Sequence, residues 1–147
     1  MSNFKKELVA VQHSRPKFDN ITKVEWIIGD VCNFTCTYCY DKEKGNFRST
    51  EDHFRAIDLL AKKFENRKFI LLLGGGEPSI RPDIKEICSY MAQRGINPQM
   101  ITNGSKSPEL YTSMMPDIVG YTFSVHFEQK GVSKTIDSIF AGTSFLL

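Results

Sequence analysis

The chain has 147 residues, the length of about one domain. Hydrophobic residues make up 41% and charged residues 24%, which is enough apolar side chain for a core and excludes wholesale disorder. The 19 Lys and Arg residues nearly balance the 17 Asp and Glu residues, and neither half is strongly basic, so nothing indicates nucleic-acid binding. The longest apolar run, residues 69–73, is far too short to span a membrane, and the first residues form no apolar signal segment. We therefore expect a cytoplasmic protein.

Short apolar runs alternate with amphipathic stretches along most of the chain. Residues 1–20 are polar and are interrupted by Pro16, so we expect a loosely packed lead-in there and a single domain over residues 21–147. In chain order, we predict a strand over 24–28, a helix over 50–66, a strand over 68–73, a helix over 82–95, a strand over 99–102, a helix over 107–116, a strand over 118–126 and a helix over 132–140.

Several of these boundaries carry their own signals. Ser49, followed three residues later by Asp52, is a capping signature for the first helix. Pro82 and Gly95 bracket the second helix, because proline favours a first helical position and glycine favours the position after the last one. The uninterrupted apolar run of the second strand is typical of a parallel sheet that is buried on both faces.

Four strand-then-helix units in a row predict an α/β fold with a parallel sheet and right-handed crossovers. In such sheets ligands bind at the carboxyl ends of the strands. Four polar or glycine-rich segments follow predicted strands, at residues 32–39, 74–78, 102–104 and 124–126. We therefore expect them to form one site at one edge of the sheet.

Three of the four cysteines, Cys32, Cys36 and Cys39, fall within eight residues, whereas Cys88 lies on the apolar face of a predicted helix. In a reducing cytosol such a cluster indicates a metal or iron–sulfur site rather than disulfides. Three thiolates on a loop can ligate one face of a [4Fe–4S] cluster and leave its fourth iron open, whereas electron-transfer clusters usually take four cysteines. Zinc would need a fourth ligand at a usual spacing, and no second cysteine pair follows. Zinc and free structural thiols remain the alternatives.

Three motifs resemble those of the radical S-adenosylmethionine (radical SAM) superfamily. They are the C-x-x-x-C-x-aromatic-C pattern at residues 32–39, Gly-Gly-Gly-Glu-Pro at residues 74–78 and Ile-Thr-Asn-Gly at residues 101–104. They occur in the order typical of the family and cover about residues 23–126. The resemblance implies a partial (β/α) barrel of the radical SAM type, of which this chain carries about four βα units where the family usually has six.

The resemblance also implies the cofactors and the chemistry. A [4Fe–4S] cluster on Cys32, Cys36 and Cys39 would bind SAM at its open iron, and an electron from the reduced cluster would cleave SAM. The resulting 5′-deoxyadenosyl radical would abstract a hydrogen atom from a substrate that the sequence does not identify. An electron donor of the flavodoxin or ferredoxin type is implied as well.

The residues that the resemblance places around SAM are Tyr38, Gly74, Gly75, Gly76, Glu77, Pro78, Asn103, Ser124 and His126. Backbone carbonyls of the glycine-rich strand end would accept from the SAM amino group, and Tyr38 would help hold the adenine unless it is a core aromatic. Glu77 is either a charge partner or a structural acceptor for loop amides. Asn103 either donates to SAM or caps a turn, and His126, where many relatives have an acid, is either a ligand or a buried, hydrogen-bonded histidine.

Four βα units do not close a barrel of six. An open sheet of four parallel strands leaves an unpaired edge, so we expect a dimer or a second chain that completes the barrel. The alternatives to an enzyme are a non-catalytic remnant that binds an Fe–S cluster or SAM and an electron-transfer Fe–S module. We further expect that valine at Gly75 weakens SAM binding and spares the cluster, unless the glycines only allow the chain to turn.

Overall fold

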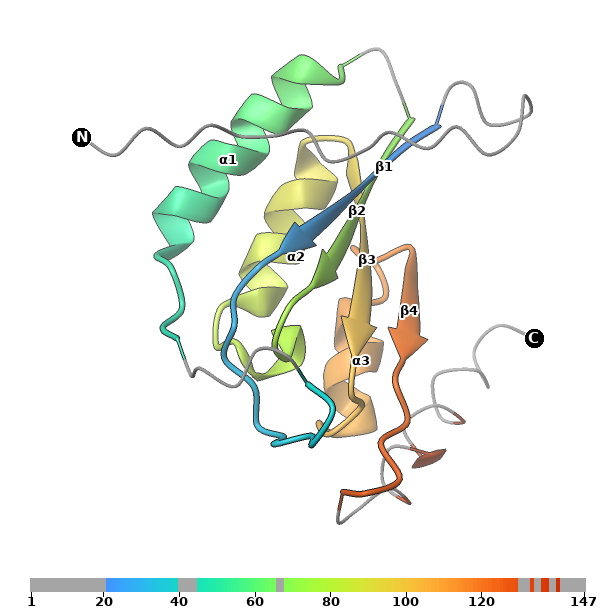
Figure 1. Cartoon of the computed structure of the whole chain (residues 1–147). Coiled ribbons are helices and arrows are strands. Elements are labelled where there is room, and N and C mark those ends of the chain that lie inside the picture. Colours follow the sequence, from blue (N-terminus) through green and yellow to red (C-terminus); the bar gives the residue numbers. More distant parts are fainter. Residues whose placement is uncertain are drawn as a thin grey trace.

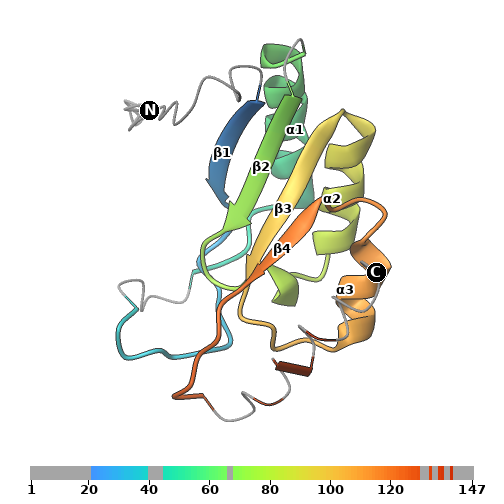
Figure 2. The same cartoon turned by 90° about the vertical axis from the view of Figure 1, so that its right-hand side faces the viewer.

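The computed structural model describes residues 21–39, 45–65 and 68–129, together with residues 133, 136, 137 and 140. The predicted lead-in over residues 1–20 and most of the predicted helix over residues 132–140 lie outside the described residues. Within the described part, four strands form one parallel sheet in the order β1-β2-β3-β4, and three helices cover one of its faces (Figures 1 and 2).

The elements follow the predicted order. The strands are β1 (Ile21–Ile27), β2 (Lys68–Gly74), β3 (Ile96–Thr102) and β4 (Gly120–Phe123). The helices are α1 (Thr50–Lys63), α2 (Ile84–Gln93) and α3 (Pro108–Met114), with a short 3-10 helix, η2 (Pro78–Ile80), after β2. The α/β class and the parallel sheet are therefore confirmed. No helix among the described residues combines the length and the apolar character needed to cross a bilayer.

Several boundaries are wrong by three residues, and those of β3 and β4 bear on the site. The structure starts β3 at Ile96, directly after Gly95, because Pro98 is tolerated inside the strand. The Pro98 carbonyl accepts from the Val119 amide, so the proline nitrogen, which has no hydrogen to donate, faces the segment just before β4. β4 begins to pair with β3 only at Gly120, so the sheet loses no hydrogen bond there. β4 ends at Phe123, so Ser124 and His126 lie on the loop after the strand rather than on the strand itself.

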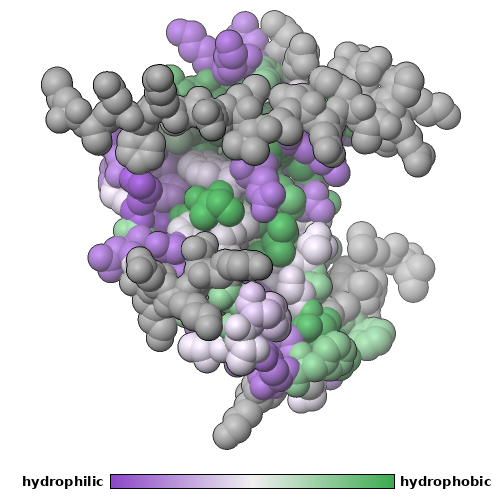
Figure 3. All heavy atoms as spheres, viewed as in Figure 1, coloured by the Kyte–Doolittle hydropathy of each residue, from purple (hydrophilic) through white to green (hydrophobic). Residues whose placement is uncertain are grey.

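The hydrophobic core lies between the sheet and the helices. Phe69, Leu71 and Leu73 of β2 alternate toward the helices and are fully buried, as are Ile57 of α1 and Ile87 of α2. The other face of the sheet is half-buried or exposed, so the full burial predicted for the second strand holds for one face only. Figure 3, seen from this open side, shows hydrophobic and hydrophilic side chains mixed over the middle of the molecule.

The first helix packs where β1 ends. Ser49 caps α1 by accepting from the Asp52 amide, as the sequence predicted. His53, in the first half of α1, is 2% exposed and stacks on Trp26. Its ring nitrogens lie 2.7 Å from the Ser49 carbonyl and 3.3 Å from the Ile28 carbonyl. This side chain therefore ties α1 to the end of β1, just before the cysteine loop.

Candidate active site

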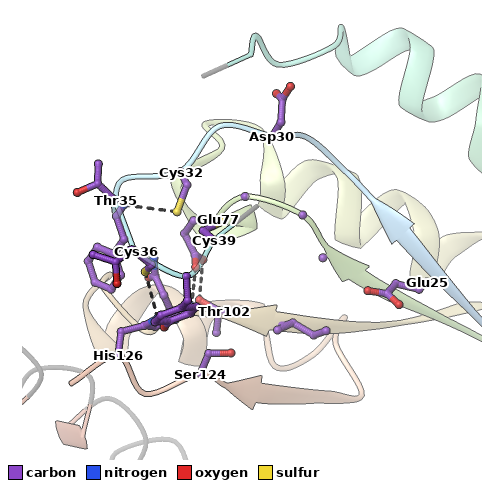
Figure 4. A pocket seen from close by; sticks show the side chains of 18 residues that line it. Glu25, Asp30, Cys32, Thr35, Cys36, Cys39, Glu77, Thr102, Ser124 and His126 are labelled. Atoms are coloured by element: carbon purple, nitrogen blue, oxygen red, sulfur yellow. Dashed lines mark hydrogen bonds between the residues drawn. The ribbon is translucent and has the colours of Figure 1, made fainter. Parts of the chain in front are cut away.

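A cavity of about 730 Å³ opens where the carboxyl ends of the strands meet, within the usual size range of ligand pockets (Figure 4). Its lining includes all residues that the sequence predicted for the site except Pro78, which is buried at the start of η2. The lining residues that were not among the predicted site residues are Glu25, Asp30, Phe34, Thr35, Thr37, Ile101 and Thr102. The four segments expected at one edge of the sheet do come together there.

The cysteine loop follows β1 and presents its three cysteines to this cavity. Cys36 is buried, Cys32 is half-buried and Cys39 is exposed. The Phe34 amide lies 3.4 Å from Cys32 Sγ, and the Cys39 amide donates to the Cys36 carbonyl. Desolvation raises the pKa of the Cys36 thiol, although a hydrogen bond with Tyr38 opposes this. Among the described residues, no three Cys, His, Asp or Glu side chains gather as they would around a single metal ion.

The loop after β4 holds the cysteine loop in place. The Glu128 carboxylate accepts from the Thr37 amide at 3.1 Å and from the Thr37 hydroxyl at 3.0 Å. Although desolvation acts in the opposite direction, these hydrogen bonds lower the pKa of Glu128. Nδ1 of His126 lies 3.3 Å from Cys36 Sγ and contacts the Tyr38 hydroxyl, as the dashed lines around His126 in Figure 4 indicate. Tyr38 is 62% exposed, so it is not the core aromatic that was its alternative.

The glycine-rich strand end is fastened to the backbone that leads into the cysteine loop. The Gly74 carbonyl accepts from the Ile28 amide at 3.1 Å, and the Gly76 amide donates to the Gly29 carbonyl at 2.8 Å. In the described structure, the carbonyls of Gly75 and Gly76 receive no hydrogen bond. These two carbonyls are therefore the ones at this strand end that can accept from a ligand.

The glycines themselves are required by this close backbone contact. Gly75 has a φ of +110°, and a Cβ there would lie 2.2 Å from the Gly29 carbonyl oxygen. A Cβ at Gly76 would lie 2.2 Å from the Val31 carbonyl oxygen. A side chain at Gly75 would therefore push against the lead into the cysteine loop instead of filling only the space of a ligand. Valine at Gly75 was expected to spare the cluster because only the ligand's space would be filled, and this argument is wrong because the Gly29 carbonyl lies in the way.

Glu77 is 2% exposed and has both carboxylate oxygens occupied. Oε1 accepts from the Ser79 amide at 2.9 Å and from the Thr102 hydroxyl at 2.6 Å, and Oε2 accepts from the Asn103 amide at 2.5 Å. The carboxylate thus joins the strand ends of β2 and β3. These contacts are those of the structural acceptor that was one of its two expected roles.

The Asn103 side chain joins two loops. Its Nδ2 donates to Asn33 Oδ1 at 2.9 Å, and its Oδ1 accepts from the Ser105 amide at 3.0 Å. Asn33, inside the cysteine loop, in turn donates to the Ser105 hydroxyl at 2.8 Å. This network links the cysteine loop to the end of β3, and it gives Asn103 the contacts of a turn cap.

Cys88 is not placed to ligate a metal or cluster at this site. It is fully buried on α2 within the core, as its helical position predicted, and it does not line the cavity. Burial raises the pKa of its thiol to about 12. A thiol that remains protonated is a poor metal ligand, because the thiolate is the form that binds metal.

The family model of the Radical SAM superfamily matches residues 26–133, which is more than half of the chain. The chain therefore belongs to the radical SAM superfamily. Members of this family bind a [4Fe–4S] cluster and SAM, the two cofactors that the sequence predicted.

Curated relatives match more than half of the chain. Fe-coproporphyrin III synthase of Methanosarcina barkeri is 36% identical over 86 residues, which covers 56% of this chain and 21% of the relative. Mycofactocin maturase MftC of Mycobacterium tuberculosis is 26% identical over 90 residues, which covers 60% of this chain and 23% of the relative. The chain thus spans less than a quarter of the length of these two relatives.

Solved structures share the fold. The crystal structure of BtrN in complex with AdoMet and 2-DOIA superposes with a TM-score of 0.63 at 16% identity, over 78% of this chain and 54% of that one. Streptococcus suis SuiB, bound to its precursor peptide SuiA, gives a TM-score of 0.53 at 19% identity, over 67% of this chain and 22% of that one. The predicted partial barrel of the radical SAM type agrees with these neighbours.

Proposed function

We propose that this chain holds a [4Fe–4S] cluster through Cys32, Cys36 and Cys39 and binds SAM beside it for reductive cleavage. The observation that carries the proposal is that the three cysteines and the strand end at Gly75 and Gly76 line one cavity. When bound, the cluster would supply the electron that converts SAM to methionine and a 5′-deoxyadenosyl radical. The radical would then take a hydrogen atom from a substrate.

The protein's own residues would position SAM and exclude water. The carbonyls of Gly75 and Gly76, which receive no hydrogen bond among the described residues, would accept from the SAM ammonium group. Phe34 packs edge-on against His126 at the cysteine end of the cavity, with ring centroids 5.6 Å apart, and would shield the cluster from solvent. Ser124 lines the cavity past β4 and would offer its hydroxyl to the ribose or carboxylate of SAM.

The partners follow from this chemistry. A one-electron donor of the flavodoxin or ferredoxin type would reduce the cluster, and the reaction would take place in the cytoplasm. The sheet of the described residues ends with β1 on one side and β4 on the other, and a second chain or a dimer would cover the open edge.

Electron paramagnetic resonance of the anaerobically reconstituted chain tests the proposal. After reduction with dithionite, we expect the signal of a reduced [4Fe–4S] cluster, and we expect SAM to change its shape because SAM binds the open iron. Cys36→Ser is the matched control and should show neither the signal nor the change. A cluster signal that SAM leaves untouched would refute the proposed binding mode.

A further inference from the structure

Glu25 lies inside the cavity but has no role in the proposed chemistry. It belongs to β1, pairs in register with Leu72, and projects from the open face of the sheet. It stands two residues before the end of β1, about 6–7 Å back along the strand from the residue at which the strand ends. Figure 4 shows it at the opposite end of the cavity from the cysteines.

The carboxylate of Glu25 is exposed and has no partner in the described part of the chain. No hydrogen bond or ion pair to it is found there, including from Lys23, two positions earlier on the same face. Its nearest surroundings are small or apolar, since a Cβ added to Gly74 would lie 3.5 Å from Glu25 Oε1 and Ile101 lines the cavity beside it. A ligand that covers this carboxylate would remove its water, which is costly unless the ligand brings a positive group to pair with it.

The charges that line the cavity also favour a positively charged ligand. Its described lining contains the carboxylates of Glu25, Asp30 and Glu77 but no Lys or Arg. Glu77 is already fully hydrogen-bonded, and His126 lies against Cys36 at the other end. The end of the cavity away from the cysteines thus presents a negative charge that has no partner among the described residues, which favours a ligand that carries a positive charge.

Resting on the proposed function, we propose that Glu25 binds a cationic nitrogen group of the substrate, an amine or a guanidinium, at the end of the cavity away from the cluster. SAM is also cationic, but the carbonyls proposed for its ammonium group, those of Gly75 and Gly76, lie on the loop beyond the end of β2 and next to the lead into the cysteine loop. Glu25 is therefore a substrate-binding residue that sets the class of substrate, and it leaves SAM binding to the strand ends.

Calorimetric titration of the reconstituted, SAM-bound chain with three matched four-carbon probes tests this inference. The probes are 1,4-diaminobutane, 1,4-butanediol and butanedioate, which share a four-carbon skeleton and end in positively charged, neutral and negatively charged groups. We expect the diamine to bind most tightly and Glu25→Gln to weaken its binding by about ten-fold, because a charge-assisted hydrogen bond is lost. The control Glu86→Gln removes an exposed carboxylate on α2 that does not line the cavity, and it should behave like the wild type.

The outcomes separate the inference from the proposed function. Equal affinity of the diamine for wild type and Glu25→Gln, or equal affinity of the diamine and the diol for wild type, would overturn the inference. So would a loss of SAM affinity in Glu25→Gln, because Glu25 would then belong to the SAM site. Failure of the proposed function itself would show in the wild type, as a chain that assembles no cluster or binds no SAM, and would remove the substrate proposal with it.

Discussion

Replacing Glu77 with glutamine should destabilise the chain severely although it changes only one atom of the side chain. In either orientation the new NH2 group faces a donor, the Asn103 amide on one side or the Ser79 amide and the Thr102 hydroxyl on the other. A hydrogen bond to a charged acceptor contributes about 1.5–3 kcal/mol, and a buried donor left without a partner costs about 1–3 kcal/mol. We therefore expect Glu77→Gln to lower the free energy of unfolding by about 3–5 kcal/mol.

Urea denaturation of the chain without cofactors, followed by circular dichroism, measures this change. A loss of this size is a large fraction of the 5–15 kcal/mol that is typical of whole domains, so the midpoint should shift clearly. Glu86→Gln, an exposed carboxylate on α2, is the control and should stay within about 0.5 kcal/mol of wild type. If Glu77→Gln were as stable as this control, the carboxylate would not be the link between β2 and β3.

Three further outcomes follow from the same contacts. Cys36→Ala should abolish cluster assembly and Cys88→Ala should retain it, as iron and sulfide content will show; the reverse pattern would refute the ligand assignment. Gly75→Ala should cost about 2 kcal/mol or more, and cluster content and SAM affinity should fall together, because its Cβ meets the Gly29 carbonyl at a φ of +110°; a loss of SAM affinity alone would contradict this. Burial raises the pKa of Cys88 from 9.0 to about 12, so the folded chain holds this proton more tightly than the unfolded chain. The protonated thiol therefore contributes its full share to the free energy of unfolding below pH 9, and this share is lost as the pH rises toward 12. Urea midpoints of wild type should therefore fall more steeply above pH 9 than those of Cys88→Ala, and parallel curves would show that Cys88 plays no such role.

The order of the strands and helices could be predicted because each element carries a local signal. The apolar run of β2, the cap at Ser49 and Gly95 just after the end of α2 are signals carried by neighbouring residues. Pro82 was expected at the first helical position, but it lies two residues before α2, which begins at Ile84 with Asp83 as its N-cap. The start of β3 could not be placed, because Pro98 is tolerated only where β4 has not yet begun to pair. That condition depends on the register of two strands, which no local pattern shows.

The same distinction applies to the site. The cysteine and glycine motifs placed the cavity correctly, because their residues follow strands that end at the same edge of the sheet. The contact between Glu128 and Thr37 was not foreseen, since the two residues are 91 positions apart, Glu128 belongs to no motif, and Thr37 fills a position of the cysteine motif at which any residue is allowed. The need for glycine at Gly75 was attributed to a ligand, whereas the backbone of Gly29 occupies the position that a Cβ would take.

The formation of 5′-deoxyadenosine tests the proposed function most directly. The reconstituted chain is reduced with dithionite in the presence of SAM, and 5′-deoxyadenosine and methionine are quantified by mass spectrometry. We expect wild type to form both products and Cys36→Ser to form neither. A sample that carries the cluster and binds SAM, yet forms no more 5′-deoxyadenosine than Cys36→Ser, would contradict the assignment of SAM cleavage to this chain.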